Sequence, residues 1–335
     1  MIRWCVIGAG GIADRRTIPA LLEDKNNVLV ALMEKNEKVG KAVSEKYGVK
    51  CYNDEEEMLK NEECDAVYIG TPVFCHYEQA MFALKYDKHV FIEKPIGLNA
   101  SEGQKMLDAF KKKNKQLFIG YMMKYHNLHQ SAKKIVAEGG IGQVSSIRLQ
   151  FTCWYPDIKG AWRQVKALGG GGAIMDLGVH CFELAEYILG EKIVETKSFY
   201  ATRTFSYEVE DSAIVAFRTE SGVLGLVDVS FNVPDKASNS KLEIYGTKGN
   251  IICSGTLAQE EVGKMAYLYS PQGDYDAAQS RTEVKPIVKY GKKSNLYLKQ
   301  ITHFTDLIKK GQCDYSFAEK AVHIQEIVDG IYAGN

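Results

Sequence analysis

The sequence predicts an α/β protein in which a doubly wound parallel sheet is followed by a domain built on an antiparallel sheet. The chain has 335 residues, more than one hydrophobic core usually supports, so two domains are expected. Up to residue 122, short apolar runs alternate with helical patterns, as in parallel sheets. Beyond it, long segments alternate apolar and polar residues, as in antiparallel sheets. We therefore expect domains at residues 1–122 and 123–335.

The elements of the first domain follow from its apolar runs. The predicted strands are 2–8, 27–34, 65–71, 89–94 and 117–121. The predicted helices are 11–23, 36–47, 54–61, 76–87 and 99–114. Asn99 and Ser101 are candidate capping residues for the last of these helices. Pro19 is expected to kink or restart the first.

The second domain begins with a helix and then becomes rich in strands. A helix at 127–138 and a strand at 144–154 precede a glycine-rich turn and a helix from Ile174 to Leu189, which Gly190 ends. The predicted strands that follow are 193–206, 210–218, 223–233, 241–246 and 249–253. Two helices, 294–310 and 317–332, close the chain. Polar segments leave the placement of strands in 256–293 open.

The composition excludes several classes of function. The 42 basic and 42 acidic residues balance, which argues against nucleic-acid or anionic-membrane partners and favours a small ligand. No apolar stretch approaches the roughly 18 residues of a membrane span, and the N-terminus has no signal-peptide layout, so we expect a cytoplasmic protein. The eight cysteines form no CxxC pair, so neither disulfides nor a structural metal is expected.

The run "VIGAGGIA" carries the strongest local motif. Gly8, Gly10 and Ala13 form a GxGxxA pattern directly after the first predicted strand and at the start of a helix. In that context glycines permit a tight turn, and helical N–H groups can bind a pyrophosphate. Gly11 and Ile12 complete this candidate dinucleotide site. The alternative is a plain strand–helix turn.

The end of the second strand bears on the choice of dinucleotide. Glu34 stands 21 positions after Ala13, close to the ~20 expected for the acid that binds the ribose hydroxyls, and this favours NAD over NADP. Lys35 is adjacent and can neutralise a ribose phosphate, which keeps NADP open. The alternative makes Glu34 a solvated charge at a strand end.

The third strand runs into "GTPVFCH", which places Thr71 and Pro72 at its carboxyl end. Ligands of open α/β sheets bind at this edge, and Pro72 cannot continue a strand ladder. His76 is also a candidate cofactor contact. Its alternative role, which the sequence favours, is simply to begin the next helix.

The run "FIEKPIG" ends a later strand of the same sheet with two charges. Lys94 is expected to face the same crevice, where it can donate a hydrogen bond to a substrate oxygen beside a nicotinamide. Glu93 can balance that charge or fix nearby backbone. The alternative is a surface ion pair.

The run "DLGVHCFE" is the last motif. Asp176 and His180 are four residues apart and Glu183 is three further on, so the three share one face of a helix. We expect an amphipathic helix whose other side packs in the core through Leu177, Leu184, Ala185 and Ile188. A polar stripe below four glycines favours function over a structural histidine.

Together these motifs resemble the glucose-fructose oxidoreductase and inositol 2-dehydrogenase family, Gfo/Idh/MocA. The resemblance spans nearly the whole chain and rests on "GAGGIA", "TPVFCH", "EKP", "DLGVH" and "GAWR". It implies a Rossmann domain and then an α+β domain with a large, mostly antiparallel, open-faced sheet that supports homodimers or homotetramers. It further implies NAD(P)-dependent oxidation or reduction of a sugar, inositol or related polyol.

The resemblance also implies roles for single residues. Lys94 and His180 would flank the reacting carbon, and Asp176 would orient them or bind substrate. The Lys94–Pro95 bond would be cis, which would aim Lys94 into the cleft. Trp162 and Arg163 look like the pair with which sugar reductases contact hydroxyl groups.

The substrate and the function both stay open at this point. The segment "GYMMKYHNLH" places Met122 and Met123 where relatives often have polar residues, so the resemblance does not carry over the identity of the substrate. Because a fold does not fix function, the alternative hypotheses are an NAD-dependent glycosidase of the same fold and a non-catalytic sugar or nucleotide sensor. A glycosidase would release sugar without net change in NADH, and a sensor would bind cofactor without turnover.

Overall fold

The computed structural model describes residues 1–273, 275, 277–278 and 284–334. The chain packs as two compact units. Unit 1 comprises Met1–Tyr121, Gly160–Gly170 and Tyr297–Asp329. Unit 2 comprises Met122–Lys159, Gly171–Leu296 and the residues from Gly330 onward. The division into domains at residues 1–122 and 123–335 stays a prediction. In the structure, two later segments, Gly160–Gly170 and Tyr297–Asp329, pack with unit 1.

Unit 1 is built on a six-stranded parallel sheet with the order β3-β2-β1-β4-β5-β6. Its strands are β1 (Ile2–Ile7), β2 (Asn27–Met33), β3 (Lys50–Tyr52), β4 (Ala66–Ile69), β5 (His89–Ile92) and β6 (Leu117–Ile119). The five predicted strands are confirmed, each ending one or two residues early. Sequence analysis missed β3 because its three residues are too few to show a period.

The helices of unit 1 follow the predicted pattern. They are α1 (Ile18–Glu23), α2 (Glu37–Tyr47), α3 (Glu55–Asn61), α4 (His76–Lys85), α5 (Ala100–Lys113) and the short α7 (Lys166–Gly169). A π-helical turn, Ala13–Thr17, precedes α1, and Pro19 lies in the first turn of α1. The helix runs without a break over residues 11–23, so no restart occurs at Pro19, and a kink there stays a prediction. Asn99 caps α5 by accepting a hydrogen bond from the Glu102 N–H at 3.0 Å.

The two closing helices are α9 (Leu296–Lys309) and α10 (Ser316–Tyr332). Phe304 of α9 packs against Trp4 of β1, with ring centres 5.0 Å apart, and against Phe91 of β5 at 5.6 Å. All three rings are fully buried. Burial of an aromatic side chain contributes about 2–3 kcal/mol, so a segment from the end of the chain completes the core of unit 1.

Unit 2 contains an eight-stranded sheet with the order β14-β13-β12-β11-β7-β10-β9-β8. Only β7 and β10 pair in parallel, which confirms the mostly antiparallel sheet. The strands are β7 (Val144–Thr152), β8 (Ile193–Ala201), β9 (Ser212–Thr219), β10 (Leu224–Ser230), β11 (Lys241–Gly246), β12 (Gly249–Ser254), β13 (Lys264–Tyr269) and β14 (Ile287–Tyr290). The last two lie in the region that the sequence left open.

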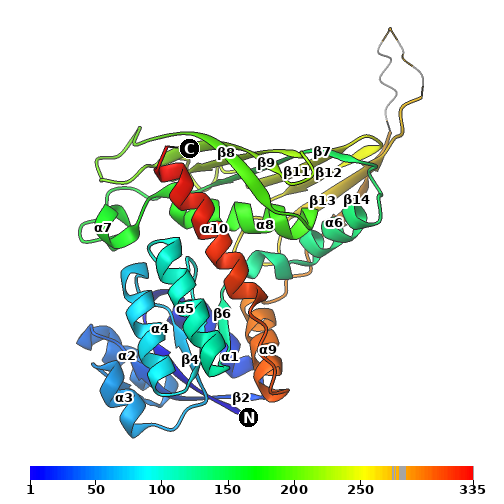
Figure 1. The fold of residues 1–335 in the computed structure, drawn as a ribbon. Coiled ribbons are helices and arrows are strands. Elements are labelled where there is room, and N and C mark those ends of the chain that lie inside the picture. The colour runs from blue at the N-terminus through cyan, green and yellow to red at the C-terminus, as the bar shows by residue number, and fades with distance from the viewer. Residues whose placement is uncertain (274, 276, 279–283, 335) are drawn as a thin grey trace. The chain divides into compact units, whose positions relative to one another are not determined.

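One face of this sheet is covered and the other is exposed. Helices α6 (Asn127–Ala137) and α8 (Val179–Leu189) lie along the covered face (Figure 1). Strand β9 alternates accordingly between buried and exposed residues. On the opposite face Phe199 is 87% exposed and pairs across strands with Ile214, which is 52% exposed. Leu224 lies on the same face and is also exposed.

The predicted helix from Ile174 to Leu189 exists, but it differs from the expectation in two ways. It begins with a π-helical turn, Ile174–Gly178, before α8. It is also buried on nearly all sides, so the expected amphipathic pattern is wrong. The reason is that α8 packs against both β7 and α6, and its polar residues are therefore enclosed.

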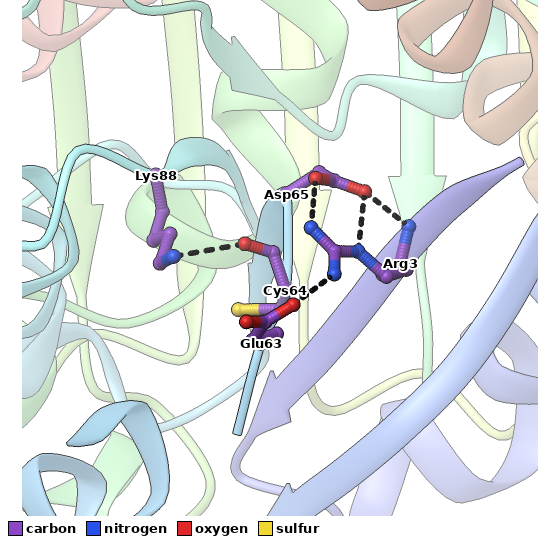
Figure 2. Close-up of polar contacts among 5 residues, drawn as sticks. All are labelled: Arg3, Glu63, Cys64, Asp65 and Lys88. Carbon is purple, nitrogen blue, oxygen red and sulfur yellow. Dashed lines mark hydrogen bonds and ion pairs between the residues drawn. The ribbon is translucent and has the colours of Figure 1, made fainter. Parts of the chain in front are cut away.

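A charged cluster lies at the amino ends of β1 and β4 (Figure 2). The Arg3 guanidinium donates to both carboxylate oxygens of Asp65, at 3.2 and 2.9 Å, and to Glu63 at 2.7 Å. This arginine holds the pKa of Asp65 below its usual range. The Lys88 ammonium donates to the Cys64 carbonyl at 2.9 Å. Arg3 is thus paired with both carboxylates at the amino edge of the sheet, whereas ligands of such sheets bind at the other edge.

Candidate functional site

A cavity of about 530 Å³ opens at the carboxyl ends of β1, β2 and β4. Seven of the predicted cofactor residues line it: Gly8, Gly10, Gly11, Glu34, Lys35, Thr71 and Pro72. Val39, Phe74 and Gln79 also contribute to its walls. Three separate segments of the sequence, 8–11, 33–39 and 70–79, therefore meet where the strand order of the sheet predicts a ligand.

The glycines of the first turn serve different purposes. Gly8 has φ of +80°, and a Cβ there would lie 2.6 Å from Thr71 Cγ2, so glycine allows β1 to approach the end of β4. Gly11 has φ of +56°, and no described atom would lie within 4 Å of its Cβ. Ile12 leads into the π-helical turn, and the Ala13 N–H donates to the Gly10 carbonyl at 3.2 Å. The turn therefore packs on one side and is open on the other.

Glu34 lies next to this turn. One carboxylate oxygen accepts a hydrogen bond from the Gly10 N–H at 3.1 Å, and the other accepts from the Asn36 N–H at 3.0 Å. Glu34 is only partly buried and lines the cavity. A hydrogen-bond acceptor is thus held at the end of β2, where a ribose diol needs one.

His76 begins α4 and is buried. Its Nδ1 lies 2.9 Å from the Pro95 carbonyl oxygen, and its Nε2 lies 2.9 Å from the Thr71 carbonyl oxygen. Burial lowers its pKa to about 4, so the ring is neutral at pH 7. Both nitrogens face the backbone, which supports the structural role, and a cofactor contact stays a prediction.

Glu93 lies at the end of β5 and joins a chain of hydroxyl groups. The Tyr68 hydroxyl donates to Glu93 at 2.7 Å, and the Thr17 hydroxyl donates to Tyr68 at 2.9 Å. Enclosure of the carboxyl raises the pKa of Glu93, although the neighbouring Lys94 charge opposes this shift. The Lys94–Pro95 peptide bond is cis, as the resemblance implied.

Arg163 and Trp162 lie in a short segment of unit 1 that is distant in sequence from the strands. The Arg163 guanidinium is 4.4 Å from the centre of the Trp162 ring, as in a cation–π pair. Burial is the largest cause of both pKa shifts, and the charges of Arg163 and Lys94 act on both groups. They add to the lowering of the pKa of His76 and oppose the raising of the pKa of Glu93. Unit 1 therefore brings these two predicted substrate-binding cations to the same carboxyl edge.

Unit 2 holds the remaining candidates. Asp176 lies in the π-helical turn, and its N–H donates to the Gly172 carbonyl at 3.0 Å. His180 lies in the first turn of α8, is 4% exposed and has its ring centre 6.3 Å from that of Phe151. Glu183 forms a buried ion pair with Lys124 at 3.4 Å.

Sequence reasoning missed three residues next to this helix. Lys124 occupies the "MMKYH" segment that departs from the family pattern, and its charge was the available signal. Glu210 and Tyr332 contact the glycine turn before the helix. No local pattern identifies them, because the glycine turn, the segment before β9 and the C-terminal helix are distant in sequence.

Some site types find no support in the part of the chain that the structure describes. Within these residues, no three side chains of histidine, cysteine, aspartate or glutamate gather as metal ligands would. None of the eight cysteines, all of which lie among these residues, forms a disulfide. No described helix has both the length and the apolar character that crossing a membrane requires.

Comparison with known proteins agrees with the motifs. Residues 2–121 match the oxidoreductase family model with an NAD-binding Rossmann fold, and residues 129–252 match the GFO/IDH/MocA C-terminal domain model. Myo-inositol 2-dehydrogenase from Thermotoga maritima is 30% identical over 258 residues, which cover 73% of each chain. The chain belongs to the Gfo/Idh/MocA family. A 1,5-anhydro-D-fructose reductase from Ensifer adhaerens is 28% identical over 265 residues, 78% of this chain and 79% of the reductase.

Solved structures share the fold of this Gfo/Idh/MocA protein. The aldose-aldose oxidoreductase from Caulobacter crescentus superposes with a TM-score of 0.87 at 23% identity, covering 99% of this chain and 97% of that one. A 3-ketoreductase from Actinomadura kijaniata, solved with NADP, gives 0.86 at 22% identity with the same coverage. GenD2 from gentamicin A biosynthesis, solved with NAD, gives 0.84 at 23% identity and covers 99% and 93%.

The chain is an oxidoreductase of this family, and its Rossmann domain is NAD-binding. The residues present fit such a group. Gly11, beside which no described atom would lie within 4 Å of a Cβ, and Glu34, whose carboxylate can accept hydrogen bonds, both line one cavity. Members of the family act on sugars and inositol, as the names of the relatives state.

Proposed function

We propose that this protein catalyses reversible hydride transfer between a nicotinamide dinucleotide and a secondary alcohol or ketone of a sugar, inositol or related polyol. The observation that carries this proposal is the set of residues at the carboxyl ends of the strands in the sheet of unit 1. There a cavity lined by the glycine turn and Glu34 is accompanied by Lys94 and Arg163, whose charges act on the same buried groups. Cations at this edge suit a substrate rich in oxygen atoms.

The nicotinamide, when bound, supplies or accepts the hydride. Lys94 donates a hydrogen bond to the substrate oxygen as negative charge grows on it. His180 exchanges the proton of the alcohol, because imidazole is the side chain best suited to proton transfer near neutral pH. Asp176 binds substrate or holds these two groups in register.

Trp162 and Arg163 anchor the rest of the sugar. The guanidinium offers several N–H donors in a fixed plane, which suits neighbouring hydroxyl groups or an acidic group. Its position over the Trp162 ring limits its rotation. This pair therefore selects substrates with polar groups next to the reacting carbon.

NAD is the proposed preferred cofactor. A carboxylate at Glu34 accepts hydrogen bonds from ribose hydroxyls and repels a ribose phosphate. Lys35 lines the same cavity and offsets part of this repulsion, so NADP binds more weakly rather than not at all.

We also propose that the protein forms a homodimer or homotetramer through the exposed face of the unit 2 sheet. Phe199, Ile214 and Leu224 expose apolar surface on neighbouring strands of that face. Light scattering should give a dimer or larger species, and Phe199→Lys with Ile214→Lys should shift the mass towards the monomer. A monomeric wild-type protein would contradict this.

The test of the proposed function follows the absorbance of NADH and NADPH against a panel of sugars, keto-sugars and inositols. With the best substrate, Lys94→Ala and His180→Ala should each lower kcat/KM about 10²–10⁴-fold. Matched controls are Lys60→Ala and His323→Ala, which lie on helices α3 and α10, and these should keep wild-type turnover.

The outcomes separate the alternatives. Wild-type turnover in both site variants would refute the assigned site. Sugar release without net change in NADH would indicate a glycosidase, and cofactor binding without turnover of any substrate would indicate a sensor.

A further inference from the structure

The glycine turn before the His180 helix packs directly against two residues from elsewhere in unit 2. A Cβ at Gly171 would lie 2.0 Å from the Tyr332 hydroxyl oxygen. A Cβ at Gly172 would lie 1.9 Å from the Glu210 carbonyl oxygen. Contacts this close exclude any side chain at either position. The glycines of this turn therefore serve to bring the backbone against Glu210 and Tyr332.

Glu210 holds the start of the helix through both its side chain and its backbone. One carboxylate oxygen accepts from the Gly172 N–H at 3.0 Å, and the other accepts from the Ile174 N–H at 2.9 Å. The Glu210 carbonyl accepts from the Ala173 N–H at 3.0 Å. Three successive N–H groups at a helix start, which lack partners within the helix, are thus satisfied by one residue.

Tyr332 fixes the carboxylate in turn. Its hydroxyl donates to Glu210 at 2.8 Å, so one carboxylate oxygen receives both this hydroxyl and the Ile174 N–H. Glu210 is 6% exposed, which leaves little room for another orientation. The tyrosine therefore selects the one rotamer of Glu210 that meets the turn.

The neighbouring residue, Asp211, anchors the segment before β9 that contains Glu210. The Asp211 carboxylate accepts from the backbone N–H groups of Arg203, Thr204 and Phe205, at 2.9, 2.7 and 3.1 Å. Its carbonyl accepts from the Phe231 N–H at 2.8 Å. Glu210 is thus attached to a rigid support, as precise positioning of a site requires.

We propose that Glu210, held by Tyr332, is a positioning residue for Asp176 and His180. This inference rests on the function proposed above. The Asp176 N–H bonds to the Gly172 carbonyl, so the position of Gly172 sets the position of the π-helical turn, and His180 follows in the next turn. A shift at Gly172 moves both side chains together, and misplacement by about 1 Å can cost about 10²-fold in rate.

A matched control separates positioning from simple stabilisation. Glu186 lies on α8, is 2% exposed and accepts a hydrogen bond from the Ile193 N–H at 2.7 Å. It is therefore a second buried carboxylate that satisfies a backbone N–H group, but at the other end of the same helix. Loss of this contact should cost stability without moving Asp176.

The experiment compares Glu210→Gln, Tyr332→Phe and Glu186→Gln in the full-length protein. In Glu210→Gln an amide NH₂ replaces one acceptor and meets a backbone N–H, so kcat should fall about 10²-fold while the Kd for NADH stays unchanged. Tyr332→Phe keeps the carboxylate and should lower kcat by less. Glu186→Gln should lower the unfolding temperature about as much as Glu210→Gln does, but it should keep kcat within about twofold of wild type.

Two results overturn the inference. One is wild-type kcat in Glu210→Gln. The other is an equal fall of kcat in Glu186→Gln at equal loss of stability, because that would show a general effect of weakening unit 2.

A second measurement does not depend on activity. Hydrogen exchange should become faster at residues 174–180 in Glu210→Gln, but not at residues 183–189, and Glu186→Gln should show the reverse. If the wild-type protein turns over no substrate, the proposed function fails while this measurement still tests the anchor. Unchanged exchange at residues 174–180 in Glu210→Gln overturns the inference itself.

Discussion

Two glycine turns of this molecule, at residues 8–11 and 171–172, have similar local hydrogen bonding but different surroundings. In unit 1, the Gly10 N–H donates to the Glu34 carboxylate at 3.1 Å, just before the π-helical turn Ala13–Thr17. In unit 2, the Gly172 N–H donates to the Glu210 carboxylate at 3.0 Å, just before a second π-helical turn. Both turns start the helices to which predicted site residues belong, and π-helical turns are frequent at functional sites.

The difference lies in what occupies the space beside the glycines. Beside Gly11 no described atom approaches within 4 Å of a Cβ position, and a cavity of about 530 Å³ borders the turn. Beside Gly171 and Gly172 the protein's own Tyr332 and Glu210 fill the space. The first turn is thus available to a ligand, whereas the second is an internal anchor. A glycine-rich turn before a helix does not by itself distinguish these uses.

The largest effect that sharpens this comparison is expected for Gly172→Ala. Its Cβ would meet a carbonyl oxygen at 1.9 Å, and backbone on both sides must move. The free energy of unfolding should fall by about 3 kcal/mol or more, as in severe overpacking. Urea unfolding measures this loss. A loss below about 1 kcal/mol would show that the second turn is not closed.

Glu34→Gln tests the open turn. Loss of the charged acceptor should weaken NADH binding about tenfold, equivalent to about 1.4 kcal/mol, and reduce discrimination against NADPH. Glu210→Gln should leave NADH binding unchanged, which makes it the control. Titration of protein fluorescence by each dinucleotide measures both. Equal affinities for the two dinucleotides in wild type, with no change in Glu34→Gln, would remove the NAD assignment.

Gly11→Ala should have a smaller effect on stability than Gly172→Ala. The Cβ enters open space, so only the left-handed backbone at φ of +56° is strained, which costs about 1 kcal/mol. NADH binding should weaken because the Cβ lies on the open side of the turn. Urea unfolding and NADH titration of the same preparation give the two values. A stability loss as large as that of Gly172→Ala would contradict the conclusion that the space beside Gly11 is open.

The smallest expected effect is a pH dependence at the closed turn. Burial raises the pKa of Glu210 above its ordinary value of 4.5, so the folded state binds the proton more tightly than the unfolded chain does. The contribution of Glu210 to stability is therefore complete below about pH 4.5 and is lost as the pH rises through the folded-state pKa.

The glutamine side chain in Glu210→Gln stays neutral at every pH, so this variant should not lose stability as the pH rises. Urea unfolding of both proteins from pH 4 to 8 should show wild type losing stability relative to the variant as the pH rises. A difference that is constant with pH would contradict the raised pKa.

Much of the fold and part of the site could be predicted, because the signals are local. The strand before Gly8, the helix after it and the cap at Asn99 each depend on residues within one turn of each other. Strand β3 was missed because three residues carry no period. The all-round burial of α8 was missed because a helix with enough polar residues looks amphipathic until its neighbours are known.

The candidate site divides in the same way. Lys94 and His180 stand out locally, because Lys94 directly follows a buried apolar run and His180 shares one helix face with two carboxylates. Glu210 and Tyr332 do not stand out, since their importance depends on atoms that are distant along the chain. Arg163 was identified by resemblance, and only the packing of its segment with unit 1 relates it to His76 and Glu93.

The sequence by itself determined the family and the two sheets, because periodicity and short motifs record local constraints. The residues proposed for hydride transfer were predicted from the same motifs. Only the tertiary structure decided which glycine turn stays open and which is closed. Whether a turn is open depends on whether side chains from remote segments fill the space beside its backbone. Because protein interiors are close-packed, a space that such side chains fill cannot also hold a ligand.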